Sequence, residues 1–284
     1  MELEFINATS NHGNYPVIGR CIYCGSTEDL SDEHCVPRSL NGLFQLKKAS
    51  CGECRDMTSS FERKITRHTL GEARAVMQYK TRRPKERKQS YPIEVRSAGE
   101  SRIVDVPVNV LPGVVPALDL GIATYLAEKY FPNDQTVPVG LKGVQPLVFS
   151  RSPTDLKNFL ENIGADSIHP KLKMDIFEFA RMLAKIAYCY SIGLPRAEGI
   201  QNSLEEVYVL GLIKGDISDP WRYVGGQPAA VLRPENPQTN PDAIAISVKD
   251  GDVLCHVQLF VQTGGPEYLI AVGRASDELR EWLE

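Results

Sequence analysis

Four cysteines in two pairs constrain the fold of this chain more than any other feature of its sequence. Cys21 and Cys24 form one C-x2-C pair, and Cys51 and Cys54 form a second pair after 26 intervening residues. Two residues between thiolates form a tight knuckle that directs both sulfurs at one ion, and two knuckles complete a tetrahedron. We therefore predict a closed, structural zinc site, in which no coordination position stays open for a substrate. The alternative is two unrelated pairs of buried cysteines.

The residues between and after the two pairs predict two strands and a helix. The chain alternates between apolar and polar residues up to Val36, which indicates a strand, and Pro37 and Asn41-Gly42 then indicate a loop. Residues 43–50 predict a returning strand, and residues 55–80 show apolar positions at near-helical spacing. The predicted order is knuckle, strand, loop, strand, knuckle and helix, which is a ββα unit held by zinc.

The motifs within this unit resemble those of a known family. The segment "DEHCVPRSLNG" runs from Asp32 to Gly42, and "LKKASCGECRDMTSSFE" runs from Leu46 to Glu62. Together with the two cysteine pairs, they are similar to the zinc-containing branch of the HNH endonucleases. The resemblance is strong over residues 21–62 and weak or absent elsewhere. It implies a metal-dependent endonuclease, in a bacterial setting, that hydrolyses phosphodiester bonds in DNA.

The resemblance also implies a role for two residues of the first motif. His34 would be the general base that takes a proton from the attacking water. Glu33 would be a ligand of the catalytic cation, Mg²⁺ or another divalent ion. Hard carboxylate oxygens suit Mg²⁺ and soft thiolates suit zinc, so one short segment is expected to hold two metals.

One position departs from the pattern of the family. The residue after the last cysteine is usually an asparagine or a histidine that binds the catalytic ion, but here it is Arg55, which has no acceptor atom. Asp56 is a substitute oxygen ligand, and Asn41 is a weaker one. Two interpretations stay open. The chain is either an active nuclease with a rearranged ion site, or a catalytically inactive HNH-like zinc module that binds nucleic acid or a protein partner.

Charge is distributed unevenly along the chain. The net charge is −4, but residues 1–92 contain 15 Lys and Arg against 11 Asp and Glu, whereas the remainder contains 17 against 25. The basic run from Lys80 to Ser90 is either a patch that contacts phosphates or a solvated linker. The residues that we predict to contact nucleic acid are Arg38, Arg55, Arg82, Arg83 and Lys85.

The remaining two-thirds of the chain predict a larger mixed domain. We place an HNH-like domain with its basic linker at residues 1–92, and an α+β domain of unknown role at residues 93–284. Residues 117–130 predict a helix, and residues 169–193 an amphipathic helix with Lys185 on its polar face. Turn signals between the apolar segments after residue 242 predict an antiparallel C-terminal meander. The whole chain is therefore expected to have an α+β fold.

The sequence also gives expectations for compartment and partners. No apolar run approaches the ~20 residues needed to cross a bilayer, and no secretion signal is evident, so we expect a cytoplasmic protein without membrane contact. Cys35, Cys189 and Cys255 fall outside the zinc pattern and are expected to be core thiols. DNA is the expected partner, and the C-terminal domain is a candidate surface for a protein partner or an oligomer. A third possibility is a regulatory or assembly protein whose function lies in that domain.

Overall fold

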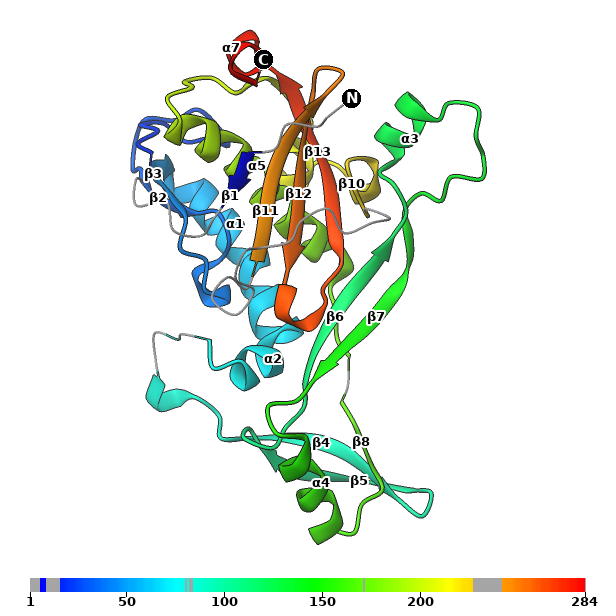
Figure 1. Cartoon of the computed structure of the whole chain (residues 1–284). Helices are drawn as coiled ribbons and strands as arrows, with labels where there is room; N and C mark the ends of the chain where they lie inside the picture. Colours follow the sequence, from blue (N-terminus) through cyan, green and yellow to red (C-terminus); the bar gives the residue numbers. More distant parts are fainter. Residues whose placement is uncertain are drawn as a thin grey trace.

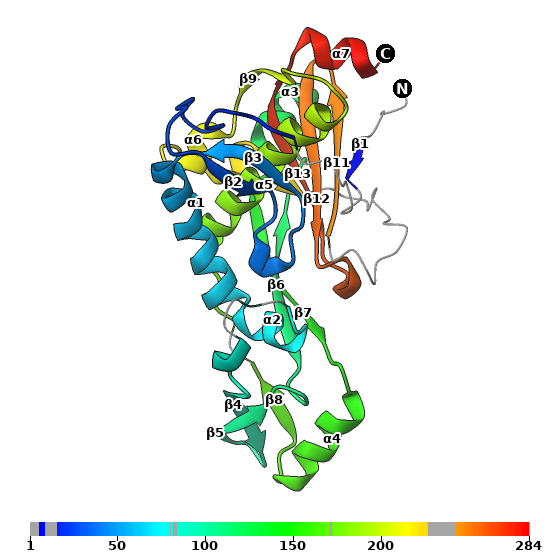
Figure 2. The same cartoon turned by 90° about the vertical axis from the view of Figure 1, so that its left-hand side faces the viewer.

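A long helix, α5 (Ile176–Ala197), lies between a C-terminal sheet and the cysteine-containing N-terminal unit (Figures 1 and 2). The structure is a computed structural model that describes residues 6–8, 16–79, 81, 84–170, 172–226 and 242–283. These residues form a mixed α+β fold, as the sequence predicts. Within the described ranges, no helix combines the length and the apolar character needed to span a bilayer.

The C-terminal sheet contains the predicted antiparallel meander. Strands β11 (Asp242–Lys249), β12 (Asp252–Leu259) and β13 (Glu267–Ala275) pair in sequence order, with Asp250 and Gly251 in left-handed conformations at the first turn. Three short strands extend the sheet: β1 (Ile6–Ala8) on β11, and β9 (Leu204–Val207) and β10 (Val224–Gly226) on β13. The first strand therefore pairs with a strand that is more than 230 residues later in the sequence.

The N-terminal unit has the predicted ββα order. Strand β2 (Ser31–His34) pairs antiparallel with β3 (Gln45–Ser50), and helix α1 (Gly52–Lys64) follows directly. The connection contains the short turn η1 (Arg38–Leu40), after which Asn41 adopts φ +65°. At Gly42 a Cβ would lie 2.0 Å from the carbonyl oxygen of Val36, so only glycine allows the loop to approach the backbone of Val36 this closely.

The single helix predicted over residues 55–80 is interrupted in the structure. Helix α1 continues into a wider π-type segment, η2 (Ile65–Thr69), and then into α2 (Gly71–Val76). The amide of Leu70 donates to the carbonyl oxygen of Ile65 at 2.9 Å, which is the hydrogen bond of a turn with one extra residue. Residues five apart lie on different faces of a regular α-helix. The wider turn brings the side chains of Ile65 and Leu70 to the same side, and both are buried in the core.

A separate arm extends from this core. Strands β5 (Glu100–Pro107), β4 (Ser90–Ser97) and β8 (Ser167–His169) form a small sheet with α4 (Pro153–Asn162) beside it. The long hairpin of β6 (Gly113–Leu120) and β7 (Leu141–Phe149) connects this arm to α3 (Thr124–Tyr130) and the main sheet (Figure 1).

The predicted helix over residues 117–130 is wrong in its first part, because residues 117–120 pair with β7. The remaining short elements are η3 (Pro84–Glu86), α6 (Leu210–Lys214), η4 (Pro220–Arg222), η5 (Val261–Thr263) and α7 (Asp277–Leu283).

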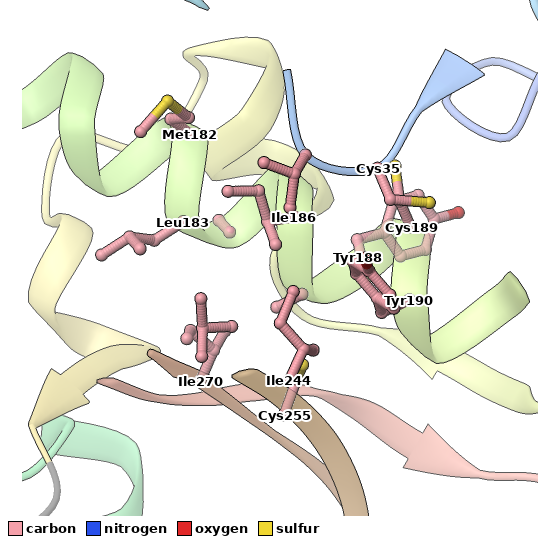
Figure 3. Close-up of a cluster of buried hydrophobic side chains, with 14 of the residues drawn as sticks. Cys35, Met182, Leu183, Ile186, Tyr188, Cys189, Tyr190, Ile244, Cys255 and Ile270 are labelled. Carbon is pink, nitrogen blue, oxygen red and sulfur yellow. The ribbon is translucent and has the colours of Figure 1, made fainter. Parts of the chain in front are cut away.

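Helix α5 differs from its prediction in both position and burial. It begins after Asp175, whose carboxylate accepts from the amide of Glu178 at 3.1 Å, and it continues beyond residue 193 to Ala197. The sheet covers one side and the N-terminal unit another, so both apolar and polar faces are covered. Figure 3 shows Leu183, Ile186 and Tyr190 of α5 in this cluster, with Ile244 and Ile270 of the sheet nearby. The sequence places Lys185 on the polar face of the helix, and the prediction that this face is solvated is wrong there because Lys185 is fully buried.

Contacts between α5 and the N-terminal unit are extensive. The rings of Phe44 and Tyr190 stack with their centroids 5.1 Å apart, and the Tyr188 hydroxyl donates to the carbonyl oxygen of Ile22 at 2.7 Å. The thiols of Cys35, Cys189 and Cys255 are buried in the same cluster, as predicted for core cysteines (Figure 3). The hydrophobic core thus extends across residue 92, where we placed the domain boundary.

Candidate metal centre and the histidine beside it

The four paired cysteines converge on one point. The sulfur atoms of Cys21, Cys24, Cys51 and Cys54 all lie within 4.8 Å of one another. The sulfurs of Cys24 and Cys51 are 3.6 Å apart, close to the ~3.8 Å that separates ligands in a tetrahedral site with Zn–S bonds of about 2.3 Å. Cys24 is exposed and the other three are buried. The donors and their spacing fit a structural zinc ion.

Local backbone structure holds both knuckles in place. The amide of Gly25 donates to the carbonyl oxygen of Cys21 at 2.8 Å, and Gly25 adopts φ +79°, which favours glycine. Cys51 is the N-cap of α1, so Cys54 lies in the first turn of that helix. Burial raises the pKa of Cys21, but backbone hydrogen bonds from Cys51, Tyr23 and Cys24 outweigh it and lower the pKa to about 7. The lowered pKa favours the thiolate form of Cys21, whereas burial raises the pKa of Cys54.

His34 lies at the end of β2, on the opposite face from Glu33. Successive side chains of a strand alternate in direction, and here Glu33 is buried whereas His34 is half-buried. A bulge between Ser31 and Glu33 shifts the pairing with β3, and the Asp32 carboxylate accepts from the amide of Lys48 at 3.1 Å. The hairpin therefore presents His34 outward from a strand whose other face belongs to the core.

The surroundings of His34 favour its neutral form. Burial lowers the pKa of His34 below its ordinary value, and the positive charge of Lys185 lowers it further. Arg38 acts in the same direction, whereas the carboxylates of Glu33 and Asp32 oppose the shift. A neutral imidazole can accept a proton near pH 7, which is the chemical requirement for a general base.

Glu33 makes an ion pair that the sequence reasoning missed. Its Oε1 atom lies 2.7 Å from the Nζ atom of Lys185, and the same Nζ lies 2.8 Å from Oε1 of Glu62. The helical pattern assigned Lys185 to a solvated face. A signal was nevertheless present, because apolar residues flank this lysine on both sides in "RMLAKIAY", which indicates burial.

The other predicted ligands of a catalytic cation are less buried than Glu33. Arg55 lies between two carboxylates, 3.8 Å from Asp29 and 4.0 Å from Asp56, and the Asp56 side chain is 84% exposed. Asn41 lies in the loop after η1. Among the described residues, the four cysteines are the one group of three or more His, Cys, Asp or Glu whose ligand atoms gather. A magnesium site formed by Glu33 and Asp56 stays a prediction.

Three of the five predicted nucleic-acid contacts are in described parts of the chain. Arg38 in η1 and Lys85 in η3 are exposed, and the Arg55 side chain is 43% exposed at the start of α1. Arg82 and Arg83 lie outside the described residues. The charge of Arg38 is close enough to His34 to affect its pKa, so one predicted phosphate contact lies beside the candidate base.

Comparisons with models of known protein families, with curated proteins and with solved structures find no match to this chain.

Proposed function

We propose that the protein is a zinc-scaffolded endonuclease that hydrolyses phosphodiester bonds in DNA, with His34 as the general base. The observation that carries the proposal is the ββα unit itself. Four converging sulfurs fix a hairpin and a helix in the order that the HNH resemblance implies, and the hairpin presents a half-buried histidine next to an exposed arginine.

The proposed reaction uses the side chains around His34. The neutral imidazole takes a proton from a water molecule, and the water oxygen attacks phosphorus. The bond between phosphorus and the leaving oxygen breaks, and that oxygen takes up a proton from solvent. Arg38 and Arg55 would hold the phosphate oxygens, because a guanidinium donates several hydrogen bonds in a fixed geometry. The requirement for a divalent cation stays a prediction, and we assign no step to the ion, since Glu33 is paired with Lys185 and Asp56 lies beside Arg55.

Nicking of supercoiled plasmid DNA tests this proposal, in buffers that contain Mg²⁺, Mn²⁺ or a chelator too weak to remove structural zinc. We expect His34→Ala to reduce the rate roughly 100-fold or more, as removal of a general base typically does. His169→Ala is the matched control, because His169 lies in β8 of the separate arm. Zinc content and circular dichroism verify that both variants fold. Equal nicking rates for His34→Ala and the native protein would show that His34 is not the general base.

A second function is a zinc module that holds nucleic acid without cutting it. Two observations favour it: Glu33 contacts Lys185 in the interior, and Arg55 replaces the usual ion ligand. This function predicts DNA binding that weakens steeply as salt increases, with no cleavage under any ion condition. If neither DNA binding nor cleavage is detected, the third possibility is favoured. In that case the protein is a regulatory or assembly protein whose C-terminal region binds a protein partner or forms an oligomer.

A further inference from the structure

Lys185 lies at the centre of a buried charge cluster that joins α5 to the N-terminal unit. Its ammonium contacts the carboxylates of Glu33 in β2 and Glu62 in α1, and none of its side chain is exposed. It also donates to the main-chain carbonyl oxygens of His34 and Cys35, the second at 3.3 Å. Two helices and the end of the β2 strand therefore meet at one nitrogen atom.

The two carboxylates of this cluster keep the Lys185 ammonium charged. An isolated charge is strongly unfavourable in a protein interior unless opposite charges and hydrogen bonds compensate for the lost hydration. Burial by itself lowers the pKa of Lys185, but the charges of Glu33 and Glu62 outweigh it and hold the pKa well above the ordinary value. For the acidic group the effects have the opposite sign. Burial raises the pKa of Glu62, and the charge of Lys185 opposes that shift.

Two carboxylates that share one cation are also a typical ligand set for a hard divalent ion. The side chains of Glu33 and Glu62 are 7% and 19% exposed, so the pair lies largely out of water. Without a cation between them, the two carboxylates would repel in a medium of low dielectric constant, or one of them would take up a proton. In this chain the cation comes from α5, more than 120 residues later in the sequence than Glu62.

We propose that the Lys185 ammonium is the built-in cation of the Glu33–Glu62 carboxylate pair and takes the place of a divalent ion there. Glu33 then binds no divalent ion in the native protein, in contrast to the role that the HNH resemblance implies. The inference does not rest on the proposed endonuclease activity, because it concerns ion binding alone.

Binding of Mn²⁺ to the full-length, zinc-loaded protein tests the inference. The electron paramagnetic resonance signal measures the concentration of unbound Mn²⁺. A titration therefore gives the Mn²⁺ affinity of the native protein and of the Glu33→Gln and Glu53→Gln variants. Glu53 is an exposed glutamate of α1, so its variant makes the same change in net charge. We expect the two variants to bind Mn²⁺ equally. Weaker binding by Glu33→Gln than by Glu53→Gln would overturn the proposal.

Removal of the ammonium gives a second, independent measurement. Lys185→Met keeps an unbranched apolar stem but leaves the two carboxylates without their cation. We expect its melting temperature to rise with Mn²⁺ concentration, whereas that of the native protein and of the triple variant Lys185→Met/Glu33→Gln/Glu62→Gln stays constant. A folded Lys185→Met protein that responds to Mn²⁺ no more than the triple variant contradicts the proposal. If Lys185→Met does not fold, the comparison of the two glutamate variants decides.

Discussion

Replacement of Cys24 by serine separates the contribution of the metal from that of packing. Cys24 is the exposed member of the four cysteines, so the substitution removes no buried contact from the core. An exposed substitution away from special features changes stability by no more than about 0.5 kcal/mol. A larger loss must therefore come from the coordination of the ion.

The expected loss follows from the energetics of structural zinc. Binding of zinc to small zinc domains contributes roughly 10–16 kcal/mol, so one of four thiolates accounts for about 2.5–4 kcal/mol if the ligands share it evenly. Domains have net stabilities of about 5–15 kcal/mol, and the loss is a large part of that total. At about 2–4 °C per kcal/mol for a chain of this size range, the melting temperature should fall by roughly 10 °C.

Urea unfolding followed by circular dichroism, with zinc measured by elemental analysis, provides the assay. Thr27→Ser is the control for an exposed change in the same knuckle, and Cys255→Ala is the control for a buried thiol outside the cluster. We expect the first control to leave stability and zinc content unchanged, and the second to lose stability but retain zinc. If Cys24→Ser unfolds within about 0.5 kcal/mol of the native protein and retains its zinc, the reasoning is refuted.

Two further predictions concern packing and pH. A Cβ at Gly193 would lie 2.6 Å from side-chain atoms of Leu46 and Phe44, so Gly193→Ala should destabilise the protein by about 1–3 kcal/mol in thermal unfolding. Gly143→Ala, where a Cβ meets nothing within 4 Å, is its control, and an equal effect of the two would contradict the close contact between α5 and β3. The folded state lowers the pKa of His34, so protonation favours the unfolded chain, and stability should fall as the pH decreases through about 6.5. His34→Gln should remove that part of the pH dependence, and an unchanged slope between pH 7.5 and 5 would show that the pKa of His34 is the same in both states.

Local patterns predicted the elements that depend on neighbours in sequence. The spacing of the cysteines predicted the metal cluster, because two residues between thiols fix the geometry of a knuckle whatever surrounds it. Turn residues predicted the meander, since Asp250-Gly251 adopts the left-handed conformations that a tight hairpin needs. The start of α4 also depends on neighbours in sequence, since the Ser152 side chain accepts from the amide of Asp155 and Pro153 is in the first turn.

Long-range packing decided what these patterns leave open. Residues 117–120 have a helical pattern but pair with β7, because a partner strand satisfies their backbone groups. The single helix after Cys54 contains a π-type turn because the core requires both Ile65 and Leu70 on one side.

The candidate site shows the same division between sequence and tertiary structure. The sequence by itself determined the four sulfur ligands, the hairpin between them and the outward position of His34, since each depends on spacing or on the alternation of a strand. Only the tertiary structure decided what Glu33 contacts. Helical periodicity distinguishes the faces of α5 but does not show that the N-terminal unit covers the polar one. Once that face is covered, the Lys185 ammonium is buried and requires carboxylates as partners. Glu33 and Glu62 provide them.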